Sequence, residues 1–106
     1  MPKYLLDVSY TLDGVRGVAA KGGSARQKAA EAAAKSVGGS LDCFYFAFGG
    51  TDVYTIADLP DNEAAAALAL TVTAGGGAQV RTVVLLTPEE VDSATKKSVT
   101  YTPPGG

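Results

Sequence analysis

Hydrophobic and polar residues alternate with a period of two in four stretches of the chain, and this period predicts four β-strands. In the first stretch, Tyr4, Leu6 and Val8 point to one side, while the residues between them form a mixed face. Gly49-Gly50 separates the second stretch from the third, so we expect these two strands to form a hairpin. The four predicted strands cover residues 4–12, 40–48, 52–59 and 79–86.

Three other segments carry the signals of helices. Ser24-Ala25-Arg26-Gln27 has the pattern of a capping box, and the alanine-rich stretch after it predicts a helix to about residue 37. Asp61 or Asn62 can cap a second helix over residues 63–73. Thr87-Pro88-Glu89-Glu90 predicts a short third helix that ends near residue 98. The glycine-containing segment 13–23 is expected to be a loop, and the Pro/Gly-rich residues 101–106 an extended or disordered tail.

This order of elements, β-α-β-β-α-β, predicts an α+β fold of the ferredoxin-like type. We expect a four-stranded antiparallel sheet with two helices on one face, plus the short C-terminal helix. Right-handed crossovers place strands 4–12 and 52–59 at the centre of the sheet. One domain over residues 1–100, followed by the tail 101–106, accounts for the whole chain.

The strand at residues 40–48 is apolar on both sides, which is unusual for an antiparallel sheet with one wet face. One face carries Phe44, Phe46 and Phe48, and the other Cys43, Tyr45 and Ala47. Two helices can cover only one face of such a sheet. We therefore expect a second copy of the chain to cover the other face, giving a homodimer or a higher homo-oligomer.

Composition excludes several classes of function. The 106 residues carry a net charge of −2, and the basic residues are scattered, so nucleic acid is not an expected partner. The absence of histidine removes the commonest general base and metal ligand, and we expect neither a metal nor another cofactor. Nothing resembles a signal peptide or a membrane span, and Cys43 is the only cysteine, which favours a cytoplasmic protein.

Asp7 is the most informative candidate for a functional site, because it lies midway along a predicted central strand. A carboxylate there is costly unless it is paired, and Arg81 on the neighbouring strand is within reach if the predicted order holds. Such a pair can be purely structural. Alternatively, Asp7 is a general base or a ligand acceptor in a cleft between the sheet and its partner.

Four further residues are candidates for ligand contacts. Tyr45 and Tyr54 can line a pocket with their hydroxyl groups, although aromatic residues in strands more often belong to a core or an interface. Gly50 and Asp52 can form a ligand-binding rim, in which Asp52 is the acceptor. The alternative is an ordinary hairpin turn in which glycine supplies a positive φ and Asp52 caps local N–H groups.

Several separated segments together resemble the GYD domain, a family of small bacterial proteins. The segments that carry the resemblance are KYLLDVSYT, GGSAR, GGSLDCFYFAFG, DVYTIADLPDNEAAAAL, LLTPEEVD and TPPG. Where the family has Gly-Tyr-Asp, this chain has Gly50-Thr51-Asp52. The resemblance implies the fold of the dimeric α/β-barrel proteins, in agreement with the order of elements, and implies no particular activity.

The sequence is therefore compatible with three functions. The first is a homo-oligomeric module that binds a small apolar ligand in a cavity lined by the sheet. The second is an enzyme without a cofactor, an isomerase or a monooxygenase, in which Asp7, Tyr45, Tyr54 or Arg81 converge on that cavity. The third is a regulatory subunit of a larger complex.

Overall fold

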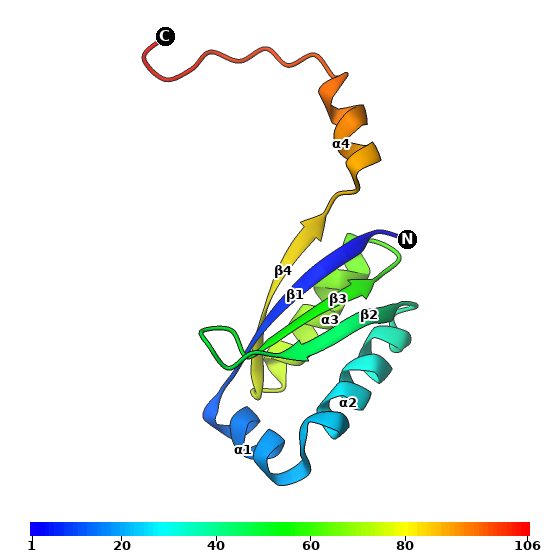
Figure 1. The fold of residues 1–106 in the computed structure, drawn as a ribbon, viewed down its shortest axis with the longest axis vertical. Helices are drawn as coiled ribbons and strands as arrows, with labels where there is room; N and C mark the ends of the chain where they lie inside the picture. Colours follow the sequence, from blue (N-terminus) through cyan, green and yellow to red (C-terminus); the bar gives the residue numbers. More distant parts are fainter.

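The computed structural model describes all residues, 1–106, and confirms the predicted ferredoxin-like α+β fold (Figure 1). The four strands form one antiparallel sheet in the order β2-β3-β1-β4, so the two central strands are the expected ones. In chain order the elements are β1 (Lys3–Tyr10), α1 (Leu12–Lys21), α2 (Gly23–Ser36), β2 (Ser40–Phe46), β3 (Val53–Asp58), α3 (Asn62–Ala74), β4 (Ala78–Leu85) and α4 (Pro88–Thr95).

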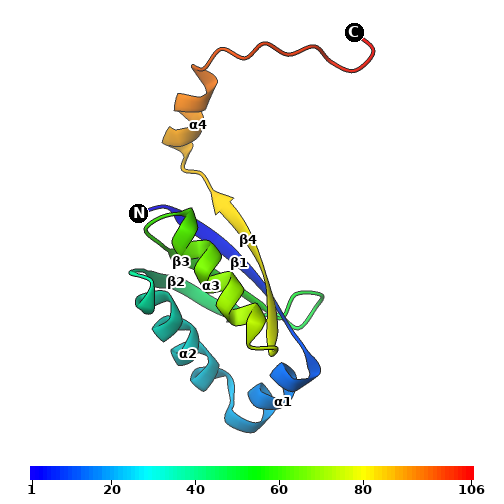
Figure 2. The ribbon, with the colours of Figure 1, turned by 180° about the vertical axis from the view of Figure 1, so that it is seen from behind.

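The two long helices, α2 and α3, lie on one face of the sheet and leave the other face bare (Figures 1 and 2). Helix α2 packs mainly on β2, whereas α3 packs mainly on β4, so contact between the two helices is slight at most. The bare side, called the open face below, is visible at the front of the sheet in Figure 1. No helix of this chain covers it.

The core is small and lies between the sheet and the two helices. Only 11 of the 106 residues are buried, and the largest fully buried side chains are Tyr4, Leu59 and Val53. Buried alanines let the helices approach the sheet closely. The hydroxyl of Tyr4 donates to Asn62 Oδ1 at 2.7 Å, which satisfies the one polar atom of this buried ring. Next to it, Asp61 caps α3 as predicted by accepting from the N–H of Ala64 at 2.8 Å.

The loop predicted at residues 13–23 is wrong, because most of this segment forms helix α1. Thr11 caps the helix, since its hydroxyl accepts from the N–H of Gly14 at 3.3 Å. The same hydroxyl donates to the carbonyl of Gly76 at 2.8 Å, and Thr11 N–H donates to the carbonyl of Gly77 at 3.0 Å. Contacts with a distant part of the chain thus offset the poor helix propensity of the glycines in α1.

The predicted capping box at Ser24 is also wrong. Only Gly22 separates α1 from α2, and it serves as the N-cap of α2 without a side-chain hydrogen bond. Its φ of +85° lies in the left-handed region that glycine adopts without strain. Because the chain turns sharply at Gly22, α2 begins at Gly23 and Ser24 already lies inside its first turn.

The loop between β2 and β3 is longer than a tight hairpin turn, since β2 ends at Phe46 and β3 begins at Val53. We expected a glycine to supply the positive φ of this turn, but the residue with positive φ is Phe48, at +56°. The ring of Phe48 stacks on that of Phe46 with 5.5 Å between the centroids. This stacking favours a conformation that is otherwise uncommon for a bulky residue.

The C-terminal arm, residues 86–106, projects away from the domain beyond the end of β4 (Figure 1). Helix α4 has the predicted capping box, with reciprocal hydrogen bonds between Thr87 and Glu90. Every residue of the arm is exposed. The arm gives the chain a radius of gyration of 16.7 Å, whereas a compact domain of this length has about 13 Å. The arm therefore begins well before the tail expected at residue 101.

Candidate functional site

Four of the sequence-predicted site residues form one row across the open face, called the polar row below. Antiparallel pairing places Asp7 opposite Tyr54 on β3 and opposite Arg81 on β4. Tyr54 is in turn paired with Tyr45 on β2. Paired residues of an antiparallel sheet point to the same side, so one carboxylate, one guanidinium and two phenols share this face.

Asp7 has the most hydrogen bonds in the polar row, because each of its carboxylate oxygens accepts one. Thr51 Oγ1 donates to Oδ1 at 2.7 Å, and Arg81 Nη2 donates to Oδ2 at 2.9 Å. The predicted ion pair between Asp7 and Arg81 is confirmed. The Asp7 side chain is 16% exposed and that of Arg81 77%, so the pair lies where the sheet meets solvent.

The two tyrosines are the accessible part of the polar row. Tyr45 is 68% exposed and Tyr54 43%, and neither hydroxyl makes a hydrogen bond within the chain. Two free phenols beside a guanidinium can donate hydrogen bonds to a polar group placed against the sheet. The polar row can therefore bind a ligand group that carries several hydrogen-bond acceptors, or it can contact the polar row of a second subunit.

A second row, the apolar row below, runs parallel to the polar one. It consists of Cys43, Ile56, Leu5 and Val83, which are paired in this order across all four strands. All four lie on the open face, two positions away from the polar row along each strand. Val83 is 45% exposed, and the other three are half-buried although no helix covers this face of the sheet.

The segment Gly50-Thr51-Asp52 holds the end of the hairpin in place. The carboxylate of Asp52 accepts from the N–H of Tyr10 at 2.7 Å, so it binds a neighbouring strand and not the local N–H groups that we expected. Gly50 is exposed, with open space around its α-carbon. Thr51 is buried at 6% exposure, and its bond to Asp7 was not predicted, because a loop residue has no register that places it.

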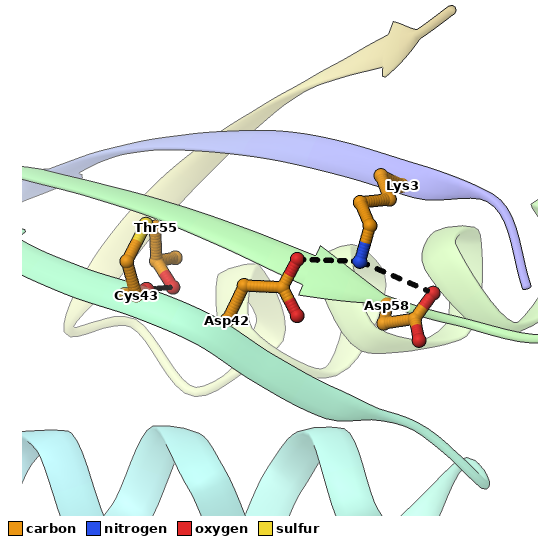
Figure 3. Close-up of polar contacts among 5 residues, drawn as sticks. All are labelled: Lys3, Asp42, Cys43, Thr55 and Asp58. Atoms are coloured by element: carbon orange, nitrogen blue, oxygen red, sulfur yellow. Dashed lines mark hydrogen bonds and ion pairs between the residues drawn. The ribbon is translucent and has the colours of Figure 1, made fainter. Parts of the chain in front are cut away.

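An ionic cluster closes one end of the open face (Figure 3). Lys3 Nζ lies 2.6 Å from Asp42 Oδ2 and 3.9 Å from Asp58 Oδ1. The hydrogen bond to Asp42 is the main cause that raises the pKa of Lys3 above its ordinary value of 10.5. Nearby, Thr55 donates to the carbonyl of Cys43 at 2.6 Å (Figure 3), and the Cys43 thiol is half-buried and unpaired.

Two adjoining cavities lie on the opposite side of the sheet, between the helices, and nothing in the sequence analysis pointed to them. The first, called the inter-helix groove, has a volume of about 90 Å³ and an almost entirely apolar lining. The second, called the vestibule, has about 340 Å³ and is lined by glycines and polar residues. Arg26 lines both cavities. Arg26 near the start of the alanine-rich helix α2 is the one sequence feature that could have indicated these cavities.

The structure contains no group of three side chains that could hold a metal ion. None of its helices combines the length and the apolar character needed to span a bilayer.

Comparison with known proteins identifies the family. No curated protein and no solved structure matches the chain. The family model of the GYD domain matches residues 4–95, which include both rows on the open face and all strands and helices except the first residue of β1. The chain therefore belongs to the GYD domain family.

Proposed function

We propose that this protein is the subunit of a homo-oligomer in which the open faces of two sheets pack against each other. The apolar row carries this proposal. It crosses all four strands in the middle of a face that the chain itself leaves uncovered, and such a surface is typical of an interface. A two-fold axis through the open face would bring the open faces of the two subunits together, so the polar and apolar rows of one subunit would lie against the open face of the other.

The exposed area supports the proposal. The chain exposes 7080 Å², whereas a compact monomer of this mass exposes about 5,500 Å². The difference exceeds the roughly 800 Å² that each partner buries in a stable interface of standard size. Every residue of the C-terminal arm is exposed, so the arm contributes to this additional area and is available to a second copy.

Two neighbouring valines on β4 give a matched test. Val83 belongs to the apolar row, whereas Val84 points to the helix side and has a similar exposure, 53% against 45%. We expect the wild type to show at least twice the chain mass of 10.7 kDa by native mass spectrometry and light scattering. Val83→Lys should give monomers, because it would bury an unpaired ammonium in the interface.

The control Val84→Lys should keep the wild-type mass. A wild-type protein that is monomeric at micromolar concentrations would contradict the proposal. So would a Val83→Lys protein that assembles as well as the Val84→Lys control.

A cofactor-independent enzyme is the second candidate, favoured by the convergence of Asp7, Arg81, Tyr54 and Tyr45 in one row. A base needs a carboxylate that is free to take a proton, and both oxygens of Asp7 already accept hydrogen bonds. The enzyme therefore requires a substrate that displaces Arg81. A structure of the oligomer decides between the candidates, because side chains that fill the space between the two polar rows leave no room for a substrate.

A further inference from the structure

The inter-helix groove exists because the two long helices stand apart above the sheet (Figure 2). Its wall on α2 consists of small side chains, Ala29, Ala30 and Ala33. Leu68 and Val72 of α3 form the facing wall. Core residues of the sheet form the floor, so the fold itself shapes the space and makes it almost entirely apolar.

Polar groups are almost absent from the groove. Its lining contains two hydroxyl residues, Tyr10 and Thr55, and one charged residue, Arg26. The hydroxyl of Thr55 already donates to the carbonyl of Cys43. Arg26 is half-buried and makes neither an ion pair nor a side-chain hydrogen bond. The guanidinium is thus the only charged group in the groove lining, and it has no partner within the chain. An apolar space of this kind holds water poorly.

The vestibule continues the groove, since Tyr10, Arg26, Val72 and Ala78 line both. Its other walls are mostly backbone, contributed by glycines of α1 and of the loop that follows α3. It is large enough for several water molecules, each of which occupies about 30 Å³ in the liquid. A ligand group placed there stays hydrated while it contacts Arg26.

We propose that the groove and the vestibule together bind a small monocarboxylate with an aliphatic body. The carboxylate pairs with Arg26, because a guanidinium matches the geometry of a carboxylate with two parallel hydrogen bonds. The aliphatic body fills the groove and removes apolar surface from water. Asp13 on the vestibule wall favours a single over a double negative charge, so a carboxylate fits better than a phosphate.

The direct test measures binding of hexanoate to the full chain by calorimetry and by NMR shifts of groove residues. Hexanoate should bind at least about tenfold more tightly than 1-hexanol, which lacks the charge, and acetate, which lacks the aliphatic body, should not bind. Arg26→Gln should remove the preference for hexanoate over 1-hexanol. The matched control Arg16→Gln, on α1 but outside both cavities, should keep the wild-type preference.

A second pair of variants tests whether the probes bind in the groove, without changing a charge. Ala30→Leu fills the groove and should abolish binding of both probes, whereas Ala32→Leu, on the exposed side of α2, should leave binding unchanged. Equal affinities of the wild type for hexanoate and 1-hexanol would overturn the proposal. So would hexanoate binding by Ala30→Leu at wild-type affinity, once its melting curve shows a folded protein.

Asp13→Asn tests the proposed arrangement of charges in the vestibule. Removal of this negative charge should strengthen hexanoate binding, because Asp13 faces the same vestibule as Arg26. A loss of hexanoate affinity in this variant would contradict the proposed arrangement of charges. Because the site lies on the helix side of the sheet, these results do not depend on whether the open faces pair.

Discussion

Asp7 has two partners that differ in their surroundings, and this difference decides how much each contributes to stability. Thr51 is buried, so its hydrogen bond to Asp7 is shielded from water. The Arg81 side chain is 77% exposed, so solvent and salt screen its charge. The neutral hydroxyl therefore stabilises the folded chain more than the cation does.

Thr51→Val should lower the free energy of unfolding by about 1–3 kcal/mol, because it leaves Asp7 Oδ1 without its buried donor while keeping the side-chain shape. Arg81→Gln should cost less than about 1 kcal/mol, the usual limit for an exposed pair. Urea unfolding at one fixed protein concentration compares the two, since assembly makes stability depend on concentration. A larger loss in Arg81→Gln would show that a partner buries this pair.

Lys3 makes the stability of the folded chain depend on pH in the alkaline range. Its pKa is raised in the folded chain, chiefly by the hydrogen bond to Asp42, so its charged form stabilises the fold from neutral pH up to the ordinary value of 10.5. As the pH rises above 10.5 and through the folded pKa, this contribution disappears. The difference in melting temperature between the wild type and Lys3→Met should therefore shrink in that range. A difference that stays constant through the same titration would show that Lys3 acts through packing alone.

The residue contacts that could be predicted are those that follow from strand register. Asp7 and Arg81 lie on neighbouring strands at paired positions, and the topology alone brings them together. The contact of Thr51 with Asp7 depends on the path of an irregular loop. The exposure of Arg26 to a groove depends on how far two helices stand apart. Neither the path of the loop nor the spacing of the helices follows from a local sequence pattern.

Helix α1 is stabilised by its contact with the loop after α3. A side chain on Gly14 would place its Cβ only 1.9 Å from the carbonyl oxygen of Gly77, so the two backbones are in direct contact. Gly17, one turn further along the helix, has open space around it. Packing therefore requires a glycine at position 14 but not at position 17.

This difference gives a matched pair of variants. Gly14→Ala should lower the free energy of unfolding by about 1–3 kcal/mol, because the backbone around Gly77 must shift. Gly17→Ala should raise it by about 0.5–1 kcal/mol, since alanine loses less conformational freedom in a helix than glycine. Thermal unfolding followed by circular dichroism measures both. Equal effects of the two substitutions would mean that α1 does not pack on the loop as described.

Elements with their own local signals were predicted, and those that depend on distant contacts were not. The four strands, α3 and α4 carry alternation or capping residues close to their ends. Helix α1 was missed because Gly14, Gly17 and Gly22 are typical of a loop, and its stability comes from the segment around Gly77. The start of α2 was misplaced for the same reason, because α1 fixes where the chain turns.

At the scale of the whole molecule, the C-terminal arm is the feature that a single chain does not explain. Helix α4 has only eight residues, and none of its side chains is buried. A helix of this length is marginal in water even with good caps. Its apolar residue Val91 is 46% exposed, and Val99 and Tyr101 further along the arm are 80% and 70% exposed. We therefore expect the arm to pack on another surface, and the proposed homo-oligomer offers that of a second copy.

Removal of the arm, residues 86–106, tests this part of the assembly. The domain without the arm should keep its melting curve at low concentration, because the arm contributes nothing buried to its own chain. Its dissociation constant for self-association should rise at least about tenfold, which corresponds to a loss of about 1.4 kcal/mol of interface energy. Val91→Lys in the full chain should weaken association in the same direction. The control Asp92→Asn changes a neighbouring polar residue of the same helix and should leave association unchanged. If both the truncated protein and Val91→Lys assemble with wild-type affinity, the open sheet face alone forms the interface and the arm is free in the oligomer.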